Sequence, residues 1–146
     1  MLTAQVQALS WKDFVGECSG VPARAPQFQA LAWKIKPGSE QTVADLFAKS
    51  GVPDHIIKGP DGSVKGRLLQ TMVLMKDNYV IRVIEFDAEM RDLINHMRQQ
   101  QEVKDLEREF EKYLEVPRDM STPDGAQKFF REAGMRVVLS RKTPTA

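Results

Sequence analysis

Arg82 is the residue whose type and position most strongly suggest chemistry. It lies in the run VIRVIE, where alternation along a strand places it on one face with Val80 and Ile84. An arginine on an apolar face needs an acidic partner or a wet cavity, because burial of an unpaired charge is costly. Two hypotheses stay open: Arg82 stabilises negative charge on a ligand oxygen, or it pairs with a carboxylate across the sheet or at a dimer edge.

Three further residues are candidates for catalysis. Arg67 opens the preceding β-rich run and, by alternation, shares the face of Met75, although a structural salt bridge is the alternative for it. His96 lies on the flank of an amphipathic helix, and His55 follows Asp54 in a long loop, where solvation is the ordinary alternative. Because histidine titrates near neutral pH, both suit general acid–base work. The predicted catalytic candidates are Arg82, Arg67, His96 and His55.

Four neutral side chains are the predicted substrate-binding candidates. Trp33 offers a flat surface on which a planar ligand can stack, although core packing is the default role of such a residue. Met75 can line a pocket for a bulky apolar ligand. Thr71 lies on the same β-rich run as Met75, and Tyr79 opens the run that contains Arg82. The charged residues 102–112, in contrast, predict a solvated helix face.

The sequence shows no motif for a metal or nucleotide site. His55 and His96 are far apart in the chain, and no cysteine or carboxylate stands at a ligand spacing from them. Gly59, Gly62 and Gly66 form neither a G-x-G-x-x-G nor a GK[ST] pattern, and there is no G-x-S-x-G. We therefore expect no metal and no cofactor.

The elements that must position these residues follow from hydrophobic periodicity and turn signals. Alternation predicts four antiparallel strands, and apolar residues spaced by three and four predict the helices between them. The order β-α-β-β-α-(α)-β, with one extra helix, indicates an α+β, ferredoxin-like sheet with helices on one face. Asp77-Asn78 predicts a tight hairpin, and Thr122-Pro123 predicts a helix start. The predicted strands are residues 28–36, 67–76, 79–87 and 135–141.

Both faces of the predicted strands carry apolar residues. Val73 and Met75 alternate with Met72 and Leu74 along one strand, so the sheet must be covered on both sides. Helices cover one side, and a partner subunit or a ligand covers the other. We expect a homodimer in which two sheets form a barrel. The predicted division is an N-terminal extension (1–27, a short helix and a linker), one domain (28–142), and a frayed tail (143–146).

Composition bounds the remaining classes. The 146 residues suffice for one domain, and 21 Lys and Arg against 20 Asp and Glu give a net charge of +1, so we expect no nucleic-acid partner. No apolar run approaches the ~20 residues that span a bilayer, and MLTAQVQALSWKDF has no basic leader before an apolar stretch. We expect no membrane partner and no secretory signal. Cys18 is the only cysteine, which fits a cytoplasmic location.

Several segments resemble the SchA/CurD family of bacterial aromatic-polyketide pathways. They are AWKIKPGSE (32–40), RLLQTMVLMKDNYVIRVIEF (67–86), LINHM (93–97) and EKYLEVPRDMSTPDGAQKFF (111–130), and the resemblance runs from about residue 29 to about residue 141. RLLQT, VIRVIE and YLEVPRD are the more specific pieces. The resemblance implies a dimeric α+β barrel and a role in making or tailoring aromatic polyketides, as in spore-pigment clusters.

Three functions fit these expectations. The first is a cyclase or aromatase that folds a poly-β-ketone or polycyclic intermediate and drives aldol closure with loss of water. The second is a cofactor-independent monooxygenase that oxidises an aromatic polyketide. The third is a non-catalytic polyketide-binding module. Of the three functions we place the cyclase first.

Overall fold

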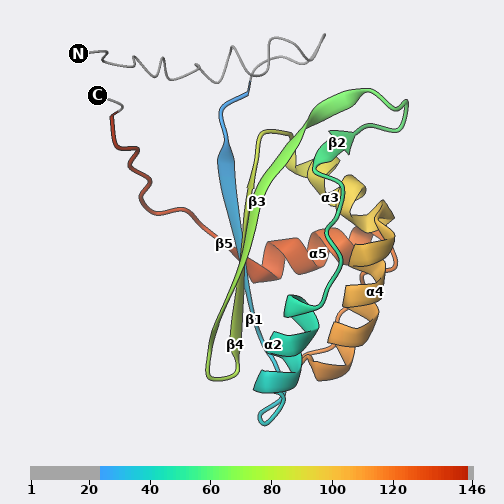
Figure 1. Cartoon of the computed structure of the whole chain (residues 1–146), viewed down its shortest axis with the longest axis vertical. Helices are drawn as coiled ribbons and strands as arrows, with labels where there is room; N and C mark the ends of the chain where they lie inside the picture. Colours follow the sequence, from blue (N-terminus) through green and yellow to red (C-terminus); the bar gives the residue numbers. More distant parts are fainter. Residues whose placement is uncertain (1–23, 145–146) are drawn as a thin grey trace, which may run out of the picture.

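The computed structural model describes residues 24–144. Most of the N-terminal extension predicted over residues 1–27, including Cys18, lies outside this range. In the described part, helices pack against one antiparallel sheet, and all of them lie on the same side of it (Figure 1). The predicted α+β fold with helices on one face is therefore confirmed.

The sheet has five strands in the order β2-β3-β4-β1-β5. The long central pairs are antiparallel: β4 lies between β3 and β1, and Arg82 stands opposite Val73 on one side and Leu31 on the other. The hairpin predicted at Asp77-Asn78 is confirmed, because Lys76 pairs with Tyr79 across it. The strands are β1 (Gln27–Lys34), β2 (Ile56–Lys58), β3 (Val64–Lys76), β4 (Tyr79–Phe86) and β5 (Gly134–Met135).

The strand boundaries differ most from the prediction in two places, and elsewhere by one or two residues. The long loop that was predicted around His55, over residues 52–66, contains β2 and the start of β3, because Ile57 is fully buried and its strand pairs with the extended β3. The last strand was predicted over 135–141 but β5 ends at Met135, since the residues that follow have no strand partner in the described chain. Val137, Val138 and Leu139 are exposed there.

A β-bulge in β3 changes which residues share a face. The pairing of β3 with β4 shifts register between Leu68 and Gln70, so alternation is interrupted there. Arg67 therefore does not share the face of Thr71 and Met75, as uninterrupted alternation had predicted. The Arg67 amide instead donates to the carboxylate of Asp87, so this carboxylate ties β3 to the end of β4.

Gly66 makes this tie sterically feasible. Its φ is +152°, and a Cβ at this position would lie 2.6 Å from the carbonyl oxygen of Asp87. Glycine alone lacks the atom that would clash, so the backbones approach closely here.

Apolar stripes place the helices against the sheet, and the helix that starts at Thr122-Pro123 also has a side-chain cap. The start predicted at Thr122-Pro123 is confirmed, because the Thr122 hydroxyl accepts a hydrogen bond from the Gly125 amide at 3.0 Å. The helices are α2 (Glu40–Ala48), α3 (Met90–Gln99), α4 (Gln101–Phe110), the short 3-10 helix η1 (Glu111–Tyr113) and α5 (Pro123–Ala133). No helix in the described range is long and apolar enough to cross a bilayer.

The hydrophobic core is divided into two clusters on the helical face of the sheet. One cluster contains Ile84 and Phe86 with residues of α3, and the other contains Val80 and Ile35 with residues of α2 and α4. On β4 these clusters meet at Arg82, which stands between Val80 and Ile84. The core is therefore interrupted at the position where the sequence places a charge.

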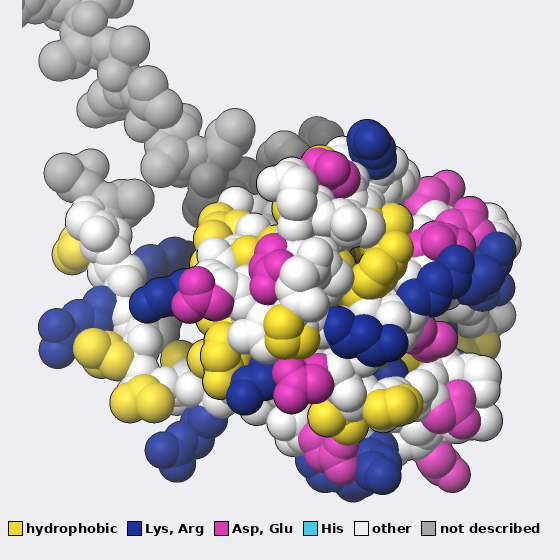
Figure 2. Space-filling model, turned by 90° about the horizontal axis from the view of Figure 1, so that it is seen from below, with side chains coloured by type: hydrophobic (Ala, Val, Ile, Leu, Met, Phe, Trp, Pro, Cys, Tyr) yellow, Lys and Arg dark blue, Asp and Glu magenta, His cyan; other side chains and the backbone are white. Residues whose placement is uncertain are grey.

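The opposite face of the sheet has no covering layer in the described chain. Its strands expose Phe28, Met72, Leu74, Tyr79 and Met135. Seen from below, the C-terminal segment stands away from the body and carries hydrophobic and basic side chains (Figure 2). Exposed apolar surface of this kind favours association.

We predict that the wild-type protein is a homodimer at micromolar concentration, with this sheet face at the interface. Leu74→Asp places a charge on the face and should give a monomer, because desolvation of an unpaired carboxylate opposes association. Val116→Asp changes an exposed valine that lies outside the sheet, and it should leave the dimer intact. Sedimentation equilibrium measures all three proteins. A monomeric wild type, or a dimeric Leu74→Asp variant, would contradict the prediction.

Candidate functional site

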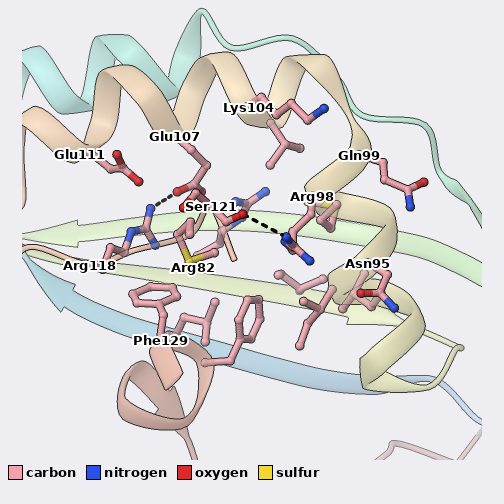
Figure 3. A pocket seen from close by; sticks show the side chains of 18 of the residues that line it. Arg82, Asn95, Arg98, Gln99, Lys104, Glu107, Glu111, Arg118, Ser121 and Phe129 are labelled. Carbon is pink, nitrogen blue, oxygen red and sulfur yellow. Dashed lines mark hydrogen bonds and ion pairs between the residues drawn. The ribbon is translucent and has the colours of Figure 1, made fainter. Parts of the chain in front are cut away.

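A cavity of about 620 Å³ lies between the sheet and the helices. Leu31, Trp33, Arg82 and Ile84 form its sheet side, and α3, α4, α5 and the loop before α5 supply the other walls. Figure 3 shows the polar side chains of α3 and α4 above the strands, with Phe129 of α5 at the lower edge. The cavity lies where the two core clusters leave a gap.

Arg82 is half-buried in this gap, and its Nε is out of contact with solvent. No described residue forms a hydrogen bond or ion pair with its guanidinium group, and its Nε has no acceptor. Burial lowers the pKa of Arg82 from its ordinary value, because the charged form loses its hydration. The salt bridge proposed for Arg82 as an alternative is thus absent from residues 24–144.

Arg118 is a second buried cation beside Arg82. Its guanidinium carbon lies 4.1 Å from the ring centroid of Phe129, 5.6 Å from that of Phe110 and 6.0 Å from that of Trp33. It also forms a close ion pair with Glu107 on α4. Burial, together with the charge of Arg82, lowers the pKa of Arg118 to about 10. Arg118 therefore remains charged at neutral pH.

The loop that carries Arg118 is fixed at both ends. Leu114 forms a β-bridge with Ile35, and the Glu115 amide donates to the Lys34 carbonyl at 3.1 Å, so the loop starts on the edge of β1. At its other end, the Asp119 carboxylate accepts hydrogen bonds from the amide and hydroxyl of Ser121, and the Ser121 carbonyl accepts one from Arg98 of α3. These contacts hold Arg118 over the aromatic rings.

Three buried donors around the cavity lack acceptors. They are Trp33 Nε1, Arg82 Nε and Arg118 Nε, none of which has a hydrogen-bond partner among the described residues. Buried polar groups are normally hydrogen-bonded, so these three donors are available to oxygen atoms that a ligand brings into the cavity.

Acidic side chains of α4 and η1 face the same space. Glu107 and Glu111 lie one helical turn apart and both line the cavity. Burial, with a smaller effect from the charge of Asp119, raises the pKa of Glu111. A carboxyl with a raised pKa can exchange a proton nearer neutral pH than an ordinary one. Residues 24–144 contain no cluster of three or more His, Cys, Asp or Glu side chains suited to hold a metal.

A second cavity of about 580 Å³ lies on the other side of Arg82. It is bounded by α2, by residues 50–53, by β3 and by the start of α4. Arg82 and Val103 line both cavities. The two hollows are therefore neighbours that share the same unpaired cation.

The structure brings half of the predicted site residues to these cavities. Arg82 lines both, Trp33 lines the first, and Thr71 and Met75 line the second. The assignment of catalytic and binding roles to them stays a prediction.

The other four predicted residues lie elsewhere. Arg67, His55, His96 and Tyr79 line neither of the two cavities. His96 is buried, and its Nε2 lies 2.6 Å from the carbonyl oxygen of Asp54, so it fastens the 52–55 segment to α3. Tyr79 is exposed beside Lys34, whose Nζ lies 5.0 Å from the tyrosine ring centroid.

Sequence reasoning missed Arg118, Glu107 and Glu111. The segment 102–112 was predicted as a solvated helix face, but Glu107 and Glu111 point from it toward the cavity. Arg118 lies in the segment YLEVPRD, which carried a specific family resemblance without an assigned role. Spacing along the helix contained the signal, because residues 103, 107 and 111 share one face.

The chain is similar to one protein family and to proteins from Streptomyces species. The family model described as "SchA/CurD like domain" matches residues 26–142. The "42.8 kDa protein in whiE locus" of Streptomyces coelicolor is 32% identical over 125 residues, covering 82% of this chain and 30% of the relative. "Polyketide synthase CurD" of Streptomyces cyaneus is 34% identical over 109 residues, covering 75% of this chain and 28% of the relative.

"Protein SchA" of Streptomyces halstedii is 27% identical over 109 residues, covering 75% of this chain and 27% of the relative. The chain thus spans less than a third of the length of the curated relatives it matches. No solved structure matches it.

We predict opposite stability effects for the two buried arginines. Arg82→Met should raise the free energy of unfolding by about 1 kcal/mol, because it removes an unpaired buried charge. Arg118→Met should lower it by about 3 kcal/mol, because Glu107 then loses its partner. Chemical denaturation of the ligand-free protein measures both. A large destabilisation by Arg82→Met would reveal a structural role and contradict the unpaired geometry.

We also predict a pH-dependent effect of Glu111→Gln. Because the folded-state pKa of Glu111 is raised, the folded state holds this proton more tightly than the unfolded state, and the carboxyl's contribution to stability is lost as pH rises through the raised pKa. Glutamine stays neutral, so the variant should match the wild type at about pH 4 and melt at a higher temperature at about pH 8. Thermal melts across this range test it. An equal difference at both pH values would exclude ionisation of Glu111 as the cause.

Proposed function

The chain belongs to the SchA/CurD-like family, and from this premise we propose that it acts in aromatic polyketide biosynthesis as a cyclase or aromatase. One curated relative is named a polyketide synthase. The substrate would be a poly-β-ketone or a partly cyclised intermediate.

The observation that carries the proposal is the unpaired Arg82 beside Arg118 in one cavity. Aldol closure of a polyketone builds negative charge on oxygen twice, first in the enolate and then in the alkoxide. Preorganised donors aimed at such an oxygen stabilise the transition state more than the ground state. A buried cation without an internal partner is preorganised in this sense, because no protein carboxylate competes for it.

Each proton movement can be assigned to Glu111. As a carboxylate, it removes a proton from the carbon between two ketones, and the electron pair moves into an enolate whose oxygen Arg82 binds. The enolate carbon then attacks a second carbonyl, and the protonated Glu111 returns the proton to the new alkoxide. Removal of a further α-proton and loss of the hydroxyl as water completes the double bond, and repetition gives an aromatic ring.

Glu107 has a different task in this proposal. Its ion pair holds Arg118 against the aromatic rings of Phe110 and Phe129. Arg118 would thus present its free Nε to a second ligand oxygen, while Trp33 Nε1 supplies a neutral donor. Glu107 is therefore a positioning residue, and the rings exclude water around the reacting oxygens.

The same anion-binding geometry also favours a cofactor-independent monooxygenase. An anthrone-type substrate held as its enolate is electron-rich and can reduce O₂ directly. One oxygen atom of O₂ then becomes bonded to the ring carbon as a carbonyl oxygen. The other oxygen atom leaves as water with the two hydrogens of the original methylene group. Arg82 would stabilise the enolate in this reaction as well.

The test measures turnover per folded molecule with two substrates, a poly-β-ketone and an anthrone-type compound. We expect Arg82→Gln to lower turnover about 100- to 1000-fold, and Glu111→Gln about 100- to 10,000-fold. Arg131→Gln changes an exposed arginine outside the cavity and should behave as wild type. Cyclisation of a synthase-derived poly-β-ketone is followed by mass spectrometry and absorbance.

Oxygen uptake with an anthrone-type substrate separates the two reactions. Uptake that depends on Arg82 would favour the oxygenase over the cyclase. Wild-type turnover by Arg82→Gln would overturn both. Tight binding of either compound with no turnover would identify a binding module instead.

A further inference from the structure

Two cavities that share one buried cation suggest a longer ligand than either holds alone. The first cavity lies beneath α3 and α4, and the second lies beside α2 and the start of α4. Val103 and Arg82 belong to the walls of both. Each volume lies within the range of about 300–1,000 Å³ that holds one small ligand.

The two cavities differ in chemistry. The second is bounded mainly by apolar side chains, and Arg82 and Glu102 are its only charged wall residues in the described chain. The first carries more basic than acidic groups: Arg82, Arg98, Lys104, Arg108 and Arg118 against Glu107 and Glu111. A matching ligand is therefore apolar toward one end and rich in oxygen toward the other.

The position of Arg82 sets where the ligand carries its charge. Because Arg82 lies at the junction, an anion bound there has one cavity on each side. A carboxylate at the end of a molecule would leave one cavity filled only by water, and its apolar walls would stay hydrated. A molecule whose charged oxygen lies near its middle can pair with Arg82 and fill both cavities.

We propose, resting on the function proposed above, that the two cavities form one site for an elongated polyketide ionised at an oxygen near the middle of its length. The ligand is a fused polycycle of three or more rings, or a linear polyketone of similar length. Its oxygen-rich half lies in the first cavity near Arg118, and its apolar half lies in the second near Phe47 and Met75.

The test compares ligands of different length in variants that fill one cavity at a time. Ala44 is a wall residue of the second cavity only, so Ala44→Phe reduces that space. Thr42→Phe places the same side chain at an exposed position of the same helix. The probes are a dihydroxyanthraquinone with both hydroxyls beside its central carbonyl, and a two-ring naphthol. Their dissociation constants are measured by fluorescence titration.

We expect Ala44→Phe to weaken the three-ring ligand at least about tenfold, which is a typical cost of one lost apolar contact surface. The naphthol should bind Ala44→Phe and Thr42→Phe as it binds the wild type. Arg82→Gln should weaken both ligands. An anthraquinone with a carboxylate at one end should bind less tightly than the dihydroxy compound.

Two results would overturn the inference. If Ala44→Phe leaves the three-ring ligand unaffected while Arg82→Gln weakens both ligands, the ligand occupies the first cavity alone, and the proposed function survives. If Arg82→Gln changes neither ligand, or neither probe binds the wild type, the shared site and the proposed function both fail.

Discussion

The burial of an unpaired guanidinium group in the middle of the sheet is the constraint on which the rest of this structure depends. Arg82 lies on the central strand β4, with β1 on one side and β3 on the other. No internal carboxylate in residues 24–144 neutralises it. Side chains cannot close over such a group without an energetic cost, so the core divides into two clusters and leaves the cavities between them. The core is packed on either side of Arg82, and the cavities lie around it.

The second arginine shows how the protein manages this constraint. Arg118 also carries a positive charge at the same cavity, but it is held by an ion pair with Glu107 and by contact with aromatic side chains such as Phe129. One cation is therefore fixed and the other is left for a ligand. Natural proteins often give up stability at functional sites in this way, because a group that binds a ligand must not be satisfied by its own chain.

The general fold could be predicted from the sequence because it depends on local signals. The hairpin at Asp77-Asn78 and the cap at Thr122 are encoded in short, specific combinations of residues, and the structure contains both. Alternation also placed Arg82 on one face with Val80 and Ile84, and in the structure this is the face that the helices cover. Alternation failed at Arg67, because a bulge depends on how two strands pair and leaves little trace in one strand's pattern. Arg118 could not be placed either, since its surroundings come from segments far apart in the chain.

The bulge in β3 also separates two parts of the sheet that can change independently. The register of residues 70–76 is set from the tight hairpin at their far end, whereas residues 64–67 follow their pairing with β2. A change of length in the turn between β2 and β3 would be absorbed before it reached the cavity walls. Over evolutionary time this end of the sheet can therefore accept insertions and deletions, while Thr71, Val73 and Met75 keep their positions toward the ligand site.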